Sequence, residues 1–264
     1  MQGQEEQYIK EKVKERYGKI ALSGNSDCCC TPRECCTNDD NNHPSALEST
    51  KLIGYDAKEI ESIPEGSILG VGCGAPTKFA EIREGETIVD LGSGAGIDVF
   101  LAAGKVGKSG KVIGVDMTDE MLQRAMKNAN HNGYTNVQFV KGDIEKRIPV
   151  DDNTADLVIS NCVINLTSDK IATFREIYRI LKNKGGRMLI SDLVTDTEIS
   201  KDSVNPDKWC SCIDGALTKE NYLNSMRKAG FQRVEVLEEK LYIDYQADNE
   251  KRKVSSLIIK AVKK

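Results

Sequence analysis

The chain has 264 residues, of which 39% are hydrophobic and 30% charged, and its formal net charge is −4. This composition is that of a globular protein large enough to bury the core of one or two domains. The negative charge argues against electrostatic binding to nucleic acid or to acidic membranes. The sequence contains no signal-peptide pattern and no apolar run of about 18 residues, so we expect a soluble, cytoplasmic protein without a membrane partner.

The N-terminal part divides into two segments of different composition. Tyr8, Val13, Tyr17 and Ile20 recur at helical spacing between charged residues, which predicts an amphipathic helix. Residues 21–44 are rich in Ser, Asn, Asp and Cys, so we expect a loop that buries no core. This loop contains CCCTPRECC, with five of the nine cysteines of the chain. A reducing compartment disfavours structural disulfides, so these thiols are more plausible as ligands or redox groups.

From Glu86 onward, short apolar segments alternate with helical patterns. The predicted strands are 87–92, 111–117, 137–143, 155–162 and 186–194, and the predicted helices are 97–106, 118–133 and 168–186. Thr118 and Ser168 are the expected N-caps, and glycines are expected to end the last two helices. The alternation predicts a parallel sheet with right-handed crossovers. Two further strands, 231–242 and 254–262, have no helix between them and predict an antiparallel pair at the sheet edge.

We therefore predict an α/β fold with a doubly wound, mostly parallel, seven-stranded sheet. The chain is expected to divide into an N-terminal helix and Cys-rich loop (1–50), a central ligand-binding core (51–194) and a C-terminal segment that completes the sheet (195–264).

The first predicted strand leads into a glycine-rich loop, VDLGSGAGID. Gly92, Gly94 and Gly96 let the backbone approach a ligand closely. The loop matches neither the dinucleotide fingerprint, whose third glycine would fall on Ile97, nor a P-loop. Asp116 ends the second strand, where a carboxylate can accept both hydroxyls of a ribose, and Asp143 follows the third, where it could accept from an adenine amino group. Each aspartate has a plainer alternative as a turn or helix cap. Together they predict an adenosine-shaped slot at the carboxyl edge of the sheet.

The segments DLGSGAG, VDM and GDIE resemble those of class I S-adenosylmethionine-dependent methyltransferases. The resemblance implies S-adenosyl-L-methionine as cofactor and a Rossmann-like fold. It also implies that Gly92, Ser93, Gly94 and Gly96 line the methionine end of the cofactor. Asp116 would hold the ribose, Met117 would pack near the adenine, and Asp143 with Ile144 would border the base.

Four further cysteines lie in the body of the chain: Cys73, Cys162, Cys210 and Cys212. A free cysteine is often just a small buried hydrophobe. However, Cys162 follows the fourth strand directly, and Cys210 and Cys212 follow the fifth, at the edge where open α/β sheets bind ligands. Gly72 and Gly74 flank Cys73 and are expected to leave its thiol free to turn toward a ligand. We therefore expect three thiols to converge beside the cofactor.

A set of three thiols limits which metal or metalloid can bind. Zinc would call for short-spaced Cys and His pairs, and the histidines of the chain, His43 and His131, do not neighbour these cysteines. Soft sulfur ligands favour a thiophilic centre. Trivalent arsenic takes three sulfur ligands and keeps a nucleophilic lone pair.

The blocks GVGCGAPT, DLGSGAG, VDMTDEML, SNCVINL and CIDGALT together resemble bacterial and archaeal arsenite methyltransferases. The resemblance implies that Cys73, Cys162 and Cys212 bind As(III) and carry catalysis. Cys212 is preferred over Cys210 because of its distance from Gly215-Ala216-Leu217. One N-terminal cysteine, for which Cys28, Cys29 and Cys30 are the candidates, is implied to pair with Cys73 in a redox cycle.

The implied activity is methyl transfer from S-adenosylmethionine to thiolate-bound As(III), which gives methyl- and dimethylarsenic in arsenic detoxification. The expected partners are arsenite or its thiol conjugates, with thioredoxin or glutathione as reductant, and lowered thiol pKa values would assist arsenic binding. Two alternatives stay open. One is another small-molecule class I methyltransferase with structural cysteines, and the other is a non-enzymatic thiol-based metalloid sensor.

Overall fold

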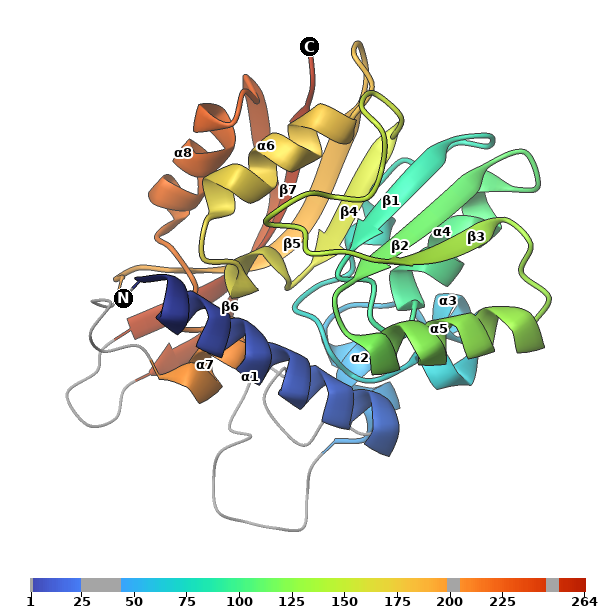
Figure 1. The fold of residues 1–264 in the computed structure, drawn as a ribbon, viewed down its shortest axis with the longest axis horizontal. Helices are drawn as coiled ribbons and strands as arrows, with labels where there is room; N and C mark the ends of the chain where they lie inside the picture. Colours follow the sequence, from blue (N-terminus) through green and yellow to red (C-terminus); the bar gives the residue numbers. More distant parts are fainter. Residues whose placement is uncertain (1, 25–43, 199–204, 246–251) are drawn as a thin grey trace.

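The computed structural model describes residues 2–24, 44–198, 205–245 and 252–264. Its centre is a seven-stranded sheet (Figure 1). The strands are β1 (Thr87–Leu91), β2 (Lys111–Asp116), β3 (Val137–Lys141), β4 (Leu157–Asn161), β5 (Arg187–Thr195), β6 (Arg233–Tyr245) and β7 (Arg252–Val262). Their order in the sheet is β3-β2-β1-β4-β5-β7-β6. The first five strands are parallel, and β7 pairs antiparallel with both β5 and β6. The predicted fold class is therefore confirmed.

The helices are placed mostly where the sequence predicts them. They are α1 (Gln2–Ser23), α2 (Ala46–Leu52), α3 (Ala57–Glu61), α4 (Ile97–Val106), α5 (Asp119–His131), α6 (Lys170–Ile180), α7 (Pro206–Cys210) and α8 (Lys219–Lys228), with 3₁₀ turns η1 (Glu65–Ser67), η2 (Pro76–Lys78) and η3 (Ile164–Leu166). None of the helices among the described residues is long and apolar enough to cross a membrane.

The predicted N-cap and the predicted end of α6 differ from the structure. α6 is capped by Asp169, whose side chain accepts the Ala172 amide, and not by Ser168. It ends at Ile180, before the expected glycines, because Leu181 turns into an extended bridge with Ala155. Thr118 is the N-cap of α5, as predicted, although its side chain makes no capping hydrogen bond.

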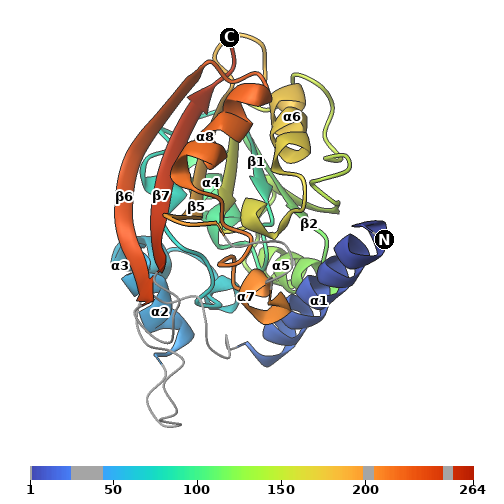
Figure 2. The ribbon, with the colours of Figure 1, turned by 90° about the vertical axis from the view of Figure 1, so that its left-hand side faces the viewer.

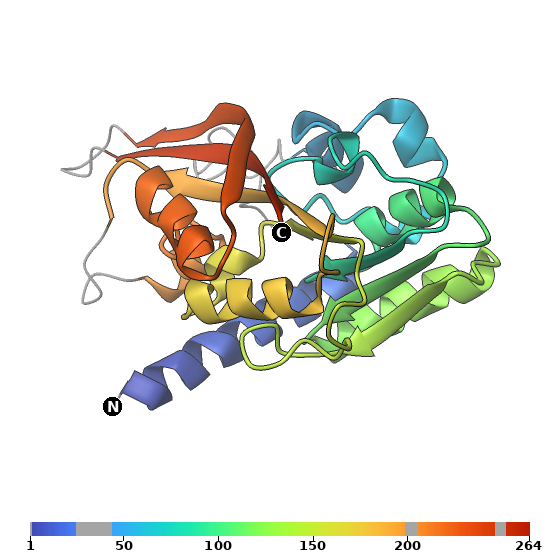
Figure 3. The same ribbon diagram turned by 90° about the horizontal axis from the view of Figure 1, so that it is seen from above.

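Successive side chains of a strand point to opposite faces of the sheet, and this divides the core into two layers. Ile88 of β1 joins Val99 and Val106 of α4 on one face of the sheet, whereas Val89 joins Phe174 of α6 on the other. Tyr222 and Met226 of α8 belong to this second layer. Figure 3 shows α6 and α8 on one side of the sheet and α4 on the other. Covering both faces is the arrangement that a doubly wound sheet requires, and it leaves the carboxyl edge free for a site.

The predicted N-terminal amphipathic helix is confirmed as α1. Its apolar residues Val13 and Ile20 are buried, and it contacts α5 and α7. Figures 1 and 2 show α1 crossing the end of the sheet near α7. The helix thus lies over the carboxyl edge of the parallel strands.

Candidate active site

The glycine loop after β1 is folded as a ligand cradle. Gly92, Gly94 and Gly96 all have positive φ (67°, 53° and 99°), which favours glycine. A Cβ on Gly92 would lie 2.4 Å from Val163 Cγ2, so the close approach excludes larger residues. Gly96 occupies the N-cap position of α4.

Asp116 ties this loop to the end of β2. Its carboxylate accepts the amide N–H of Gly94 (2.9 Å) and that of Thr118 (2.8 Å). Burial raises the pKa of Asp116 despite these hydrogen bonds. The carboxylate is thus fixed at the pocket wall, and each oxygen keeps a lone pair with which to accept a further hydrogen bond.

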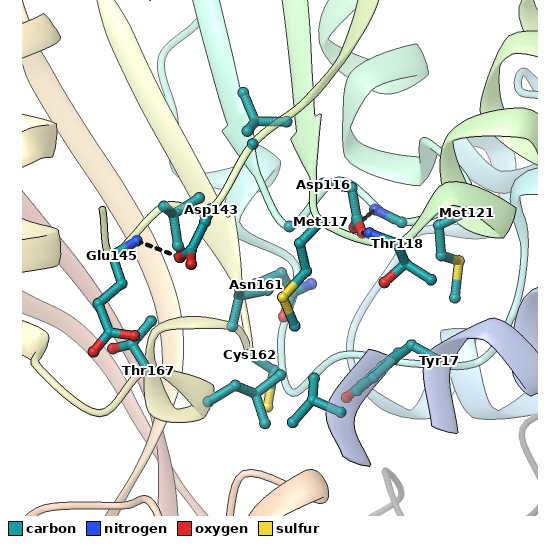
Figure 4. Close-up of a pocket in the computed structure, with 18 of the residues that line it drawn as sticks. Tyr17, Asp116, Met117, Thr118, Met121, Asp143, Glu145, Asn161, Cys162 and Thr167 are labelled. Atoms are coloured by element: carbon teal, nitrogen blue, oxygen red, sulfur yellow. Dashed lines mark hydrogen bonds between the residues drawn. The ribbon is translucent and has the colours of Figure 1, made fainter. Parts of the chain in front are cut away.

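A pocket of about 810 Å³ opens at this edge of the sheet. Of the predicted cofactor residues, it is lined by Gly92, Gly94, Asp116, Met117, Asp143 and Ile144. Ser93 and Gly96 do not line the pocket. They form the turn between β1 and α4, in which the backbone N–H of Gly96 donates to the carbonyl of Ser93 (2.9 Å). Figure 4 shows Met117 projecting into the space between Asp116 and Cys162.

A second group of acidic residues faces Asp116 across this pocket (Figure 4). Asp143 and Glu145 both form ion pairs with Lys10 of α1, at 2.9 and 2.7 Å. Burial works to raise the pKa values of both carboxyls, but the hydrogen bonds from Lys10 outweigh it and the pKa values are lowered. Sequence reasoning missed Lys10 because nothing in its local sequence indicates a partner 133 residues away.

Three cysteines lie together beside the pocket, as the sequence predicts. Cys73, Cys162 and Cys212 belong to one buried cluster with Leu193, Ile213, Ala216, Tyr242 and Val254. The Cys212 thiol donates to the carbonyl oxygen of Cys162 (2.9 Å). Cys162 also lines the pocket, so the cluster meets the pocket at this residue. These cysteines carry no disulfide in the structure.

Asn161, the last residue of β4, holds the Cys73 segment in place. Its Oδ1 accepts the amide of Cys73 (3.0 Å), and its Nδ2 donates to the carbonyl of Gly74 (2.7 Å). The expectation that the flanking glycines leave the thiol free to turn is wrong. A Cβ on Gly74 would lie 2.3 Å from Ser191 Oγ, and one on Gly72 would lie 2.9 Å from Asn161 Nδ2, so these glycines permit tight packing.

Two of the three cysteines have strained backbones. Cys162 and Cys212 have φ values of 59° and 62°, in the left-handed region that non-glycine residues seldom occupy. Such a conformation costs about 1–2 kcal/mol and persists where the surroundings enforce it. For Cys162 the restraint includes the hydrogen bond from its amide to the carbonyl of Ser191 (2.8 Å). Strain of this kind is typical of functional positions.

The pKa values of two of the three thiols, Cys162 and Cys212, are raised. Hydrogen bonding with Cys212 and Cys73, together with burial, raises the pKa of Cys162 well above its usual range. The hydrogen bond from Cys162 lowers the pKa of Cys212, but burial and the negative charge of Asp192 outweigh it, so this pKa is also raised. Both pKa values are raised because each thiol lies in a buried site beside other acidic groups.

A carboxylate completes the cluster. One oxygen of Asp192 lies within 4.8 Å of the sulfurs of Cys73 and Cys162. Burial raises the pKa of Asp192 to about 6, so the group is ionised at neutral pH. The nearby ammonium of Lys170 is also buried, and burial lowers its pKa to about 8. Sequence reasoning missed Asp192, although an acidic residue within the apolar strand GRMLISDLV was a usable signal.

Cys210 and the redox candidates do not belong to the cluster of three cysteines in the described part of the chain. Cys210 is buried at the end of α7 but does not belong to the cluster of Cys73, Cys162 and Cys212. Its carbonyl accepts a hydrogen bond from Tyr17 of α1 (3.3 Å). The redox candidates Cys28, Cys29 and Cys30 lie outside the described residues.

The glycine loop after β1, the aspartate at the end of β2 and the pocket at the carboxyl edge of the sheet are the features expected of a class I methyltransferase. Residues 82–230 match the family described as "Methyltransferase domain", and the chain belongs to this family. Among its relatives are enzymes named arsenite methyltransferase. The relative from Halobacterium salinarum is 42% identical over 86% of this chain, and that from Aquipseudomonas alcaligenes is 34% identical over 87%. The chain spans 58% and 64% of their respective lengths.

A solved structure adds a three-dimensional likeness. The arsenic(III) S-adenosylmethionine methyltransferase from Chlamydomonas reinhardtii is 32% identical, with a TM-score of 0.65. The alignment covers 84% of this chain and 75% of that one.

Proposed function

We propose that this protein transfers methyl groups from S-adenosylmethionine to trivalent arsenic held by Cys73, Cys162 and Cys212. The observation that carries this proposal is the buried cluster of three thiols beside the pocket that follows the glycine cradle. The similarity to arsenite methyltransferases from three organisms supports it. The product series would be methyl- and dimethylarsenic, in keeping with a role in arsenic detoxification.

The pocket fits the cofactor on chemical grounds. Gly92 and Gly94 line the pocket with backbone that carries no Cβ, and Asp116 offers acceptors to the ribose hydroxyls. Met117 and Ile144 supply apolar contacts for the adenine, and Asp143 borders the base. When bound, S-adenosylmethionine supplies a methyl group made electrophilic by its sulfonium.

The thiols act first as ligands. Because Cys162 and Cys212 have raised pKa values, they enter arsenic binding as protonated thiols. Each arsenic–sulfur bond that forms then releases a thiol proton, which leaves with a hydroxide of arsenite as water. The soft sulfur ligands suit As(III) and leave its lone pair free. Positioning and exclusion of water, rather than a general base, would account for the acceleration.

Methyl transfer oxidises arsenic formally by two electrons. Two thiolates can return these electrons by leaving as a disulfide, which restores the trivalent state. We assign this role to Cys73 together with one of Cys28, Cys29 and Cys30. Thioredoxin or glutathione would reduce the disulfide in an exchange between thiolate and disulfide.

Product analysis of the whole chain tests the proposal. The protein is incubated with arsenite, S-adenosylmethionine and a thiol, and the arsenic species are separated and identified by mass spectrometry. We expect methylated arsenic. Its absence would contradict the proposal, and arsenite binding without consumption of S-adenosylmethionine would favour the metalloid sensor.

Single cysteine variants identify the ligands. Cys162→Ser and Cys212→Ser should each lower turnover by more than about a hundredfold, because a hydroxyl is a poor ligand for a soft centre. Cys210→Ser is the matched control, since Cys210 is equally buried but outside the cluster, and it should stay within about threefold of wild type. Full activity of Cys212→Ser would move the third ligand elsewhere. Arsenite turnover unaffected by any of the three changes would indicate structural cysteines.

A further inference from the structure

The carboxylate of Asp192 has a position that its structural contacts do not explain. It lies on β5 and is fully buried, and one of its oxygens is within 4.8 Å of the Cys73 and Cys162 sulfurs. Burying a charge is costly unless hydrogen bonds or an opposite charge compensate it. A neutral amide of the same shape could make most of the same contacts at lower cost.

The hydrogen bonds of Asp192 fix its orientation. Oδ2 accepts from the hydroxyl of Tyr222 (2.9 Å) and from the backbone N–H of Asn165 (3.0 Å). Oδ1 accepts from the backbone N–H of Leu193 (3.0 Å). These donors come from α8, η3 and β5, so three elements hold one side chain. Such a carboxylate does not need to reorganise during a reaction, which is the condition for electrostatic preorganisation.

Asp192 is not neutralised by a direct ion pair in the described part of the chain. The neighbouring ammonium of Lys170 donates to the carbonyl oxygens of Asn165 (3.4 Å) and Thr167 (3.1 Å) instead. Lys170 therefore offsets the charge of Asp192 only through its field, without a direct contact, and part of the negative charge acts on the thiol cluster.

The proposed reaction moves positive charge toward this cluster. The arsenic lone pair forms the As–C bond, and the C–S bond breaks with its electron pair going to sulfur. The sulfonium becomes a neutral thioether, and the formal positive charge passes to arsenic. No proton, oxidant or reductant enters this step.

We infer that Asp192 accelerates methyl transfer by stabilising the positive charge that develops on thiolate-bound arsenic. Asp192 does not bind arsenic in this role and is not needed to retain it. It acts through the field of its carboxylate, which is strong because the site excludes water. The inference rests on the proposed function and assigns a further residue to it.

The test compares two variants at the same hydrogen bond. Asp192→Asn removes the charge with little change in shape, and Tyr222→Phe removes the hydroxyl donor but leaves the charge. Arsenite affinity is measured without cofactor by equilibrium dialysis, and single-turnover methyl transfer is measured with arsenite prebound. We expect Asp192→Asn to lower the transfer rate about ten- to a hundredfold with arsenite affinity within about threefold of wild type. Tyr222→Phe should keep both quantities within about threefold.

Three outcomes would overturn the inference. One is an unchanged transfer rate in Asp192→Asn. Another is a parallel loss of arsenite affinity and rate in that variant, and the third is an equal loss of rate in both variants, since each indicates a purely structural carboxylate. Failure of the proposed function is distinct, because wild type itself would then form no methylated arsenic.

Discussion

Asn161 shows how one side chain sets the distance between two of the cysteines. It stands next to Cys162 in the chain and hydrogen-bonds the backbone on both sides of the Cys73 side chain. It also donates to the hydroxyl of Tyr55 (2.9 Å), which in turn donates to Asp98 (2.8 Å). The Cys73 segment is irregular, so these bonds replace the ladder that a strand would provide.

We expect Asn161→Ala to lower arsenite affinity about tenfold, because two buried hydrogen bonds to the Cys73 segment are lost. The affinity is measured by dialysis without cofactor. Asn136→Ala is the matched control, since Asn136 also makes two hydrogen bonds to the backbone and donates to the carbonyls of Ala103 and Gly107, away from the thiols. If both variants lose stability but neither loses affinity, Asn161 does not position Cys73.

At the scale of elements, α1 forms one wall of the cofactor pocket. Lys10, Val13 and Tyr17 line the pocket from this helix, and Lys10 joins it to the acidic pair after β3. The shape of the pocket therefore depends on the position of α1.

The charge of Lys10 can be reversed to test this dependence. Lys10→Glu should raise the KM for S-adenosylmethionine about fivefold or more, because like charges would face Asp143 and Glu145 and displace the helix. Lys19→Glu serves as the control, since Lys19 is exposed on α1 and pairs with Glu15 of the same helix (2.8 Å). Steady-state kinetics at saturating arsenite give the comparison. Equal KM values for wild type and Lys10→Glu would show that α1 does not shape cofactor binding.

For the whole molecule, buried carboxyls link stability to pH. Burial raises the pKa of Asp98 to about 6, above its value of about 4 in an unfolded chain. The folded state therefore binds the proton more tightly, and the stability that this carboxyl contributes is present below pH 4 and is lost as pH rises through 6.

Asp98→Asn should remove this dependence while still accepting the Tyr55 hydrogen bond. From pH 4.5 to pH 8, the free energy of unfolding of the variant should gain about 2 kcal/mol relative to wild type. Urea denaturation at the two pH values measures the difference. A constant difference between the two proteins would mean that Asp98 titrates normally.

Much of this organisation was predictable from the sequence because parallel strands bring their carboxyl ends to one edge. That rule alone places Gly92, Asp116, Asp143 and Cys162 together. The resemblance of the cysteine blocks supplied the choice of Cys212 over Cys210.

The rest depends on contacts between distant segments. The pairing of Lys10 with Asp143 joins two residues whose local sequences carry no sign of each other. The raised thiol pKa values follow from three acidic side chains buried together, which no single motif contains. The αL backbones of Cys162 and Cys212 are likewise set by their surroundings, since cysteine does not favour that conformation.

The strand order β5-β7-β6 has a consequence for synthesis on the ribosome. β6 precedes β7 in the chain, but the strand that pairs with β5 is β7, and β6 pairs only with the outer edge of β7. The edge of β5 that pairs with β7 therefore stays open until residues 252–262 have emerged. Since Asp192 and Leu193 lie on that strand, the nascent chain exposes an unpaired strand edge beside the cluster of three cysteines. Completing the hairpin closes this edge and finishes the site in one step.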